Sequence, residues 1–202
     1  MRKKNSKKIL IIYLIVIIIP CISNLIKKLK SFTDVILTLD YIFGSLIILH
    51  IFIKTFKKRA SFNHLIKWGL IGYIFALTLQ IIIVWIEKQL HIFKISNNTI
   101  SFIHEIKNFP LMSLIVIIAA PIMEEIVFRQ ILFNDFCKVY NILMSAIISS
   151  FIFALFHDDG HIITYTLIGM IFCFIYKKGK SVYADIISHV LMNATITFFY
   201  FL

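Results

Sequence analysis

Two adjacent glutamates and an arginine lie inside a long apolar stretch of this chain. Glu124, Glu125 and Arg129 interrupt a run of apolar residues between Leu111 and Phe133. A charge at the centre of a bilayer costs at least ~3 kcal/mol, so ionisable groups at such a depth are candidates for function. Glu125 and Arg129 are four residues apart and share one helix face, where they can pair. Glu124 lies roughly 100° around the helix and needs a partner from another part of the chain.

Three later side chains could supply that partner. His157 ends the apolar run 142–157, and His189 and Asn193 lie four residues apart in the run 182–202. Carboxylates and imidazoles act as general bases that can activate water, and an amide donor can stabilise an oxyanion. No serine, cysteine or threonine in these segments stands in a recognisable nucleophile arrangement. An activated water is therefore the more economical attacking group.

The elements that must position these groups are membrane helices. The chain has 202 residues, of which 60% are hydrophobic, with a mean hydropathy of +0.92. A soluble domain is nearer to half apolar and could not bury this much apolar surface. Pro121 is expected to kink the fourth apolar run just before the glutamates. We expect an all-α bundle of about seven transmembrane helices, whose polar groups lie on the last four, with apolar runs at 9–26, 35–53, 65–86, 110–133, 142–157, 162–176 and 182–202.

The net charge of +11 is typical of membrane topology and not of nucleic-acid binding. With the N-terminus inside, fourteen basic residues lie in inside segments and six in outside segments. This bias predicts a cytoplasmic N-terminus and the lipid bilayer as a partner. The richness in isoleucine, lysine, phenylalanine and asparagine suggests a bacterial source, and so a bacterial plasma membrane. The three cysteines sit in or beside apolar runs and are interpreted as small buried residues.

Three spaced motifs occur in order along the chain, each in an apolar segment: Glu124-Glu125-x-x-x-Arg129, Phe153-x-x-x-His157 and His189-x-x-x-Asn193. This trio resembles the CPBP family of intramembrane proteases, which includes CAAX proteases and bacteriocin-processing (Abi) proteins. The resemblance favours a division into N-terminal transmembrane helices with an outer loop (1–108) and a catalytic helical core (109–202). Gln130 departs from the pattern, because many members have glycine after the arginine.

The resemblance implies an intramembrane endopeptidase that cleaves a peptide or a membrane protein. By analogy, Glu124 and His157 would activate a water molecule. His189 and Asn193 would bind that water or stabilise the oxyanion. The substrate itself is not indicated by any motif.

The resemblance leaves the cofactor open between none and zinc. Glu124, His157 and His189 would form a His₂Glu ligand set with one open position, as catalytic zinc requires. A metal-free mechanism would use the same side chains. His161 lies four residues after His157 and offers a different metal pair, although its polar surroundings are typical of a solvated loop.

Other functions fit parts of the pattern. Glu125 and Arg129 would, by the same resemblance, form a structural pair that holds the fourth apolar run. A non-enzymatic bacteriocin-immunity or membrane scaffold protein of the same fold could keep these residues for packing alone. Buried glutamate and histidine chains also serve in transporters and proton relays. An internal inverted repeat would favour a transporter, and the sequence shows none.

Overall fold

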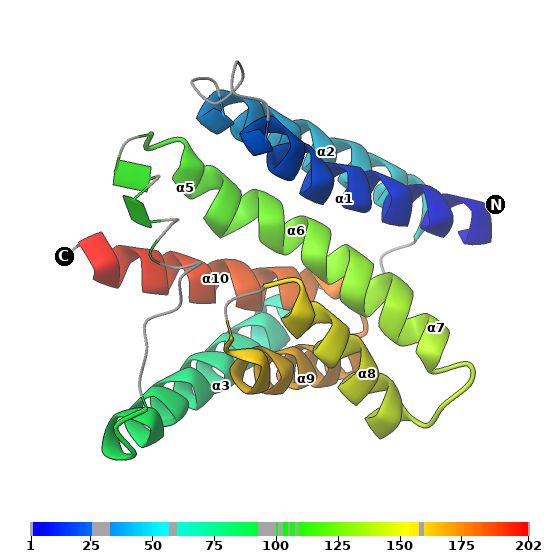
Figure 1. Ribbon diagram of the computed structural model, residues 1–202. Coiled ribbons are helices and arrows are strands. Elements are labelled where there is room, and N and C mark those ends of the chain that lie inside the picture. The colour runs from blue at the N-terminus through cyan, green and yellow to red at the C-terminus, as the bar shows by residue number, and fades with distance from the viewer. Residues whose placement is uncertain are drawn as a thin grey trace.

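The computed structural model describes residues 2–25, 33–56, 60–92, 100, 103–104, 106–107, 109–157 and 160–201. Part of the expected outer loop and most of the link between the first two runs lie outside these residues. Every regular element among the described residues is helical, and two of them, labelled η, are π-helices (Figure 1). The elements are α1 (Arg2–Leu25), α2 (Thr33–Thr55), α3 (Phe62–Gln89), α5 (Met112–Leu114), η2 (Ile115–Ala119), α6 (Ala120–Glu125), η3 (Ile126–Phe133), α7 (Asn134–Phe136), α8 (Ile142–Leu155), α9 (Ile162–Gly179) and α10 (Val182–Phe201).

The prediction of an all-α bundle is confirmed, since each of the seven apolar runs forms one helical segment. α5, η2, α6, η3 and α7 follow without a break and together form the fourth of these segments. Four described helices are long and apolar enough to cross a membrane, by length and composition: Val35–Thr55, Phe62–Gln89, Ile162–Gly179 and Val182–Tyr200. α8, with 14 residues, is shorter. The chain is therefore an integral membrane protein.

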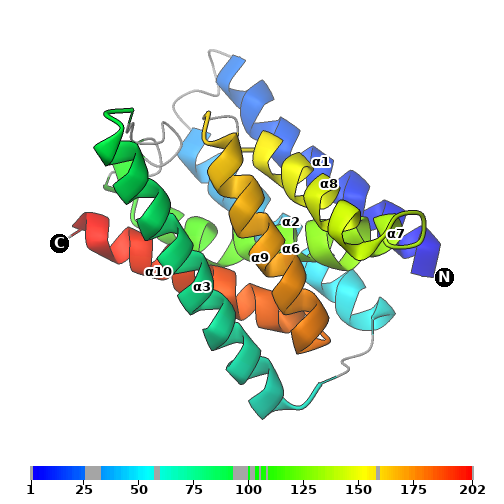
Figure 2. The ribbon, with the colours of Figure 1, turned by 90° about the horizontal axis from the view of Figure 1, so that it is seen from below.

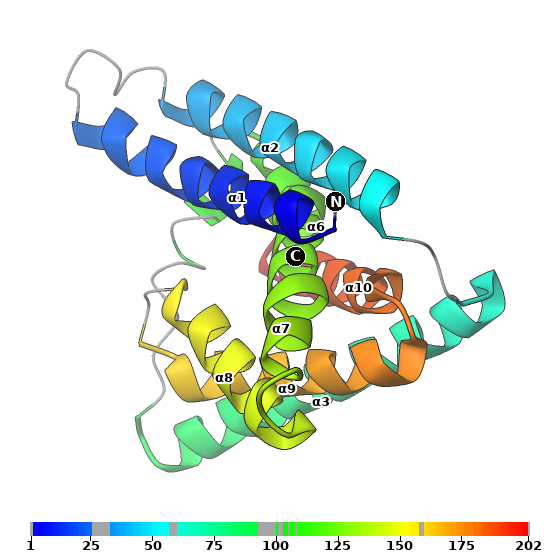
Figure 3. The same cartoon turned by 90° about the vertical axis from the view of Figure 1, so that its right-hand side faces the viewer.

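The fourth segment lies at the centre of the bundle. In Figure 3, α6 and α7 run between the α1–α2 pair and the group formed by α3, α8 and α9. α3, α9 and α8 lie side by side (Figure 2), and α10 packs against α3 and α6. The helix with the two glutamates thus contacts helices from both ends of the chain.

Small residues let α10 approach α3 closely. A side chain added at Gly69 would collide with Ile187, and one at Gly72 would collide with Ser188. The Ser188 hydroxyl also donates a hydrogen bond of 2.8 Å to the carbonyl of Gly69. Such small-residue contacts and interhelical hydrogen bonds stabilise helix pairs in membranes. Because Ser188 precedes His189, this contact fixes the helix turn that carries the histidine.

The central segment departs from α-helical geometry on both sides of the glutamates. The π-helix η2 ends directly before Ala120, whose N–H bonds the carbonyl of Ile115, five residues earlier. In that register the carbonyl of Val116 would be paired with residue 121. Pro121 has no N–H, so the carbonyl of Val116 has to find its partner on another helix. The disturbance expected from Pro121 therefore takes the form of a widened helix, a feature often found at functional sites.

Candidate active site

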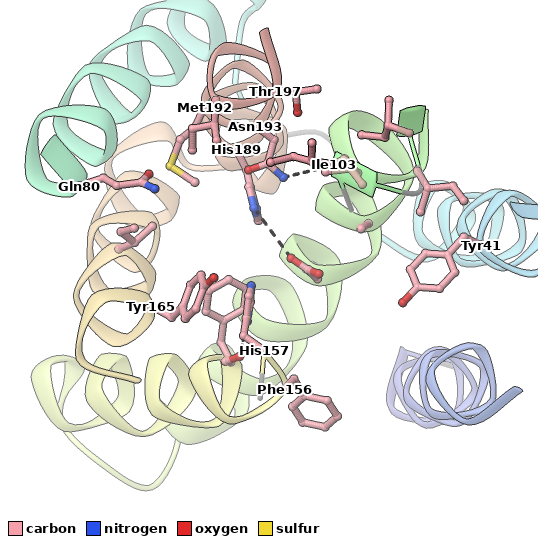
Figure 4. A pocket seen from close by; sticks show the side chains of 18 of the residues that line it. Tyr41, Gln80, Ile103, Phe156, His157, Tyr165, His189, Met192, Asn193 and Thr197 are labelled. Atoms are coloured by element: carbon pink, nitrogen blue, oxygen red, sulfur yellow. Dashed lines mark hydrogen bonds and ion pairs between the residues drawn. The ribbon is translucent and has the colours of Figure 1, made fainter. Parts of the chain in front are cut away.

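All four side chains assigned to the chemistry line one cavity. The cavity has a volume of about 250 Å³, and Glu124, His157, His189 and Asn193 contribute to its wall (Figure 4). They come from α6, from the end of α8 and from α10. The remaining wall is mixed, with Tyr13, Ile17, Tyr41, Gln80, Ile103, Ile106, Ile115, Val116, Ala120, Phe153, Phe156, Tyr165, Ile168, Met192, Ile196, Thr197 and Tyr200.

Glu125 and Arg129 form a fully buried ion pair beneath this cavity. The Nε of Arg129 lies 3.1 Å from Oε2 of Glu125, and both side chains have an exposed fraction of 0%. Glu124, by contrast, has an exposed fraction of 20%. Removing one partner of a buried pair leaves an uncompensated charge, so each of the two residues depends on the other.

His189 connects the buried pair to the cavity. Its Nδ1 lies 2.8 Å from Oε1 of Glu125, and because a carboxylate only accepts, Nδ1 must carry the hydrogen. In the neutral ring Nε2 is then an acceptor, and it lies 3.9 Å from Oε2 of Glu124. The sequence left the partner of Glu124 open and did not predict that His189 would bond Glu125. The distance to Glu124 is too long for a direct hydrogen bond.

Asn193 bonds the carbonyl that Pro121 leaves without a partner. Its Nδ2 donates a hydrogen bond of 2.9 Å to the oxygen of Val116. A buried carbonyl without a donor costs about 1–3 kcal/mol, so this bond stabilises the widened turn before the glutamates. Asn193 therefore contacts the backbone as well as lining the cavity. The sequence predicted a role for it only in the reaction.

His157 lies in the turn that follows α8, where backbone and ring contacts hold it. Its backbone N–H bonds the carbonyl of Ala154, and its Nδ1 lies 3.0 Å from the carbonyl of Phe153. Because that carbonyl accepts, Nδ1 carries the hydrogen and Nε2 can act as an acceptor. The ring stacks on Tyr165, with centroids 3.9 Å apart. The tautomer and the ring plane are thereby both fixed.

Phe153 joins the buried charge to the two histidines. The guanidinium carbon of Arg129 lies 4.4 Å from the centre of the Phe153 ring, a cation–π distance. The same ring lies edge-on to His157 at 4.6 Å and to His189 at 6.2 Å. The spacing Phe-x-x-x-His thus places an aromatic ring below the histidine of the same helix end. Phe172 completes the apolar enclosure, stacked on His189 at 5.0 Å.

Asp185 is a buried acid that the sequence analysis did not single out. It lies one helical turn before His189 on α10 and has an exposed fraction of 0%. Neither of its carboxylate oxygens has a hydrogen-bond partner among the described residues, and its charge interacts with those of Arg129 and Glu125. The four-residue spacing from His189 was the signal that could have identified it. Gln80, whose Oε1 is also buried without a partner there, could not have been found by spacing.

The ligand set suggested for zinc is not assembled. Within the described ranges, no three histidine, cysteine, aspartate or glutamate side chains come together closely enough to hold a metal ion. Glu124, His157 and His189 are thus not close enough together to form the ligand set. His161 was the alternative metal partner of His157, but its Nδ1 lies 3.8 Å from Oε1 of Glu87.

Comparison with known proteins gives a family for this arrangement. Residues 106–195 match the family model described as type II CAAX prenyl endopeptidase Rce1-like. Over these residues the chain is similar to the Rce1-like family. All three motifs lie inside the matched region, and the family resemblance predicted from them is confirmed.

Two curated relatives of this chain are named as membrane proteases. One, named as membrane peptidase YdiL of Bacillus subtilis, is 34% identical over 69% of this chain and 58% of its own length. The other, named membrane-embedded CAAX protease MroQ of Staphylococcus aureus, is 28% identical over 68% of this chain and 59% of its own length. The chain thus spans less than two thirds of either relative. No solved structure matches it significantly. The family and both names support a membrane protease.

Proposed function

We propose that this chain is an intramembrane endopeptidase in which Glu124 and His157 activate a water molecule. The observation that carries the proposal is the single cavity lined by Glu124, His157, His189 and Asn193, which come from three separate helical segments. The names of the relatives favour the same class of reaction. The substrate is a peptide or a membrane protein.

The attacking water binds between Glu124 and His189. Oε2 of Glu124 and Nε2 of His189 are 3.9 Å apart, a separation that a bridging water can span. Both atoms are acceptors, so the water donates one hydrogen to each of them. Glu124 takes up the proton as the water oxygen attacks the peptide carbonyl. His189 holds the oxygen in place, because its own orientation is set by Glu125.

His157 serves as the second acid–base group. Its ring lines the same cavity, and the bond from Nδ1 to the carbonyl of Phe153 presents Nε2 as the exchangeable position. The proton that Glu124 removes from the water passes to Nε2 of His157, and the imidazolium donates it to the leaving amine as the C–N bond breaks. Asn193 uses one N–H on Val116, and its amide carries a second N–H that can donate to the oxyanion.

Glu125 and Arg129 support these groups without contacting the substrate. Both are fully buried, and neither lines the cavity. Their pairing neutralises charge inside the bundle and gives Nδ1 of His189 a fixed acceptor. We therefore assign them to positioning.

The cavity fits an extended peptide better than a folded domain. Its volume of about 250 Å³ is below the usual range of small-molecule pockets, so it admits the bond to be cleaved with its neighbouring side chains. The apolar wall from α1, α2 and α10 suits an apolar segment. We propose a cytoplasmic N-terminus in a bacterial plasma membrane, in line with the distribution of basic residues. We also propose that residues 109–202 form the catalytic core.

The experiment uses a library of quenched fluorescent peptides with the protein in nanodiscs. Wild type is compared with Glu124→Gln and His157→Ala, and with the exposed acid variant Asp135→Asn as a matched control. The proposal expects cleavage by wild type and by the control, and none by the two cavity variants. Cleavage that survives in Glu124→Gln would contradict the proposal. Folded wild type without cleavage of any peptide would favour an immunity or scaffold protein.

A further inference from the structure

A second cavity lies at the end of the bundle that carries the N-terminus. Its volume is about 880 Å³. The start of α1, the ends of α2 and α9, the start of α10 and the region from η3 to α7 meet there. The lining residues are Arg2, Phe52, Thr55, Phe56, Gln130, Asn134, Tyr176, Lys177, Lys180, Ser181 and Tyr183. With the N-terminus inside, the alternation of the apolar runs predicts that the start of α1, the ends of α2 and α9 and the start of α10 lie on the same side of the membrane, and they meet at this cavity.

The charge in this cavity is of one sign. Arg2, Lys177 and Lys180 contribute three cations, and none of the described residues that line the cavity is acidic. The Arg2 guanidinium lies 4.9 Å from the centre of the Phe56 ring, and Nζ of Lys177 lies 5.1 Å from that of Phe133. Among the described residues, both cations contact aromatic rings and neither pairs with a carboxylate, so their charge stays available to a ligand.

Lys180 occupies a backbone position that favours glycine. Its φ is 56° and its ψ is 19°, in the left-handed region, at the residue that ends α9. Glycine is the usual residue there because it adopts this conformation without steric cost. A lysine at this site indicates that its side chain, which lines the cavity, has a use that offsets the backbone cost.

Neutral donors and an apolar wall complete the cavity. Ser181 precedes the first residue of α10, so the positive end of that helix dipole lies at the cavity. The Asn134 side chain bonds the Tyr176 hydroxyl and the carbonyl of Gln130. On the opposite wall, Phe52 stacks on Phe56 with ring centres 5.4 Å apart. A ligand here would meet cations, hydroxyls and aromatic rings.

We propose that this cavity binds the phosphate of an anionic phospholipid headgroup. Cations grouped between the ends of membrane helices are the recognition pattern for such headgroups. The aromatic wall of Phe52 and Phe56 suits the first carbons of an acyl chain. The proposal goes beyond the proteolytic function and does not depend on it.

The test measures lipid binding by native mass spectrometry on the purified full chain in detergent. Phosphatidylglycerol, phosphatidylcholine and inorganic phosphate are added separately to wild type, Lys177→Gln, Lys180→Gly and Lys178→Gln. Lys178 neighbours Lys177 but does not line the cavity, so it is the matched control. Lys180→Gly removes a charge where glycine suits the backbone, so this variant is expected to fold as well as wild type, which its melting temperature checks.

The proposal expects phosphatidylglycerol to bind more tightly than phosphatidylcholine and than inorganic phosphate. Lys177→Gln and Lys180→Gly should each weaken phosphatidylglycerol binding roughly fivefold, the share expected of one basic residue at a membrane surface. Lys178→Gln should bind like wild type. Equal binding of both lipids, or an equal loss in Lys178→Gln, would overturn the proposal in favour of general surface attraction. If inorganic phosphate bound as tightly as phosphatidylglycerol, the proposal of a lipid ligand would be overturned in favour of free phosphate.

Discussion

Glu124 and Glu125 are neighbours in the chain but lie in different environments. Glu125 is fully buried and contacts Arg129 at 3.1 Å and His189 at 2.8 Å. Glu124 is partly exposed to the cavity, and its Oε2 lies 3.9 Å from Nε2 of His189. The helix turns by about 100° per residue, so one step along the chain separates a supporting group from one that can reach substrate.

The comparison shows how a membrane protein can place a reactive carboxylate. A single buried carboxylate would need its own compensation. Here the charge of Glu125 is compensated, because one of its carboxylate oxygens pairs with Arg129 and the other accepts a hydrogen bond from His189. Glu124 lies at the cavity wall, and the 3.9 Å between its Oε2 and Nε2 of His189 leaves room for a bridging water. The following predictions test this division, from the largest expected effect to the smallest.

Glu124→Gln should abolish cleavage while the fold is kept. Loss of a general base lowers rates by about 10²–10⁴-fold. Glutamine has nearly the same size, and Glu124 makes no direct side-chain hydrogen bond to another described residue. Initial rates on a cleaved peptide, together with melting temperature in detergent, measure both effects. A large drop in melting temperature would instead place Glu124 with the supporting groups.

Glu125→Gln should destabilise the bundle. Breaking a buried ion pair from one side costs about 3–5 kcal/mol, because Arg129 would remain charged and unpaired. The double variant Glu125→Gln, Arg129→Met removes both charges and should recover much of this loss. Denaturant titration of the four proteins in the cycle gives the coupling. Additive losses in the double variant would argue against a structural pair.

Asn193→Ala should destabilise the protein by about 1–3 kcal/mol, because the carbonyl of Val116 loses its donor. Pro121→Ala returns an N–H to the position that faces this carbonyl. The double variant should therefore be more stable than Asn193→Ala alone. If Asn193 also donates to the oxyanion, cleavage stays low in the double variant even though stability returns. If both stability and cleavage returned in the double variant, the role of Asn193 would be restricted to its hydrogen bond with the Val116 carbonyl.

A chelator should change the cleavage rate little. The described residues do not bring three metal-binding side chains together, whereas Glu124 and His157 can activate water directly. Rates before and after EDTA treatment, followed by zinc addition, measure the effect. Activity lost with EDTA and restored by zinc would require Glu124, His157 and His189 to rearrange into a ligand set.

Much of the fold could be predicted because apolar runs in a membrane protein leave few alternatives to helices. The spacing of Glu125 and Arg129 also allowed their ion pair to be anticipated. Depth was harder. A count of about 1.5 Å per residue from the inside end of each apolar run predicts that Glu124 lies roughly 20 Å and His189 roughly 13 Å deep in the membrane. The structure brings their side chains within 3.9 Å, because α10 and α6 cross obliquely and η3 changes the helical rise.

The contacts between helices were harder to predict. They depend on which faces of two helices pack together, and the sequence of one helix does not determine this. The bond from His189 to Glu125 and the bond from Asn193 to Val116 both join α10 to the fourth segment. Pro121 predicted a disturbed helix, but not that Asn193 would bond the carbonyl exposed by it. The role of Phe153 became clear only when Arg129, His157 and His189 were placed around one ring.

The most direct test of the division between the two glutamates measures peptide binding and cleavage by Glu124→Gln in the same nanodisc preparation. A fluorescent peptide that wild type cleaves serves for both. We predict that the variant binds it with nearly wild-type affinity and releases no product, because only the proton acceptor has been removed. Cleavage at a rate close to that of wild type would contradict the account and leave Glu124 as a packing residue.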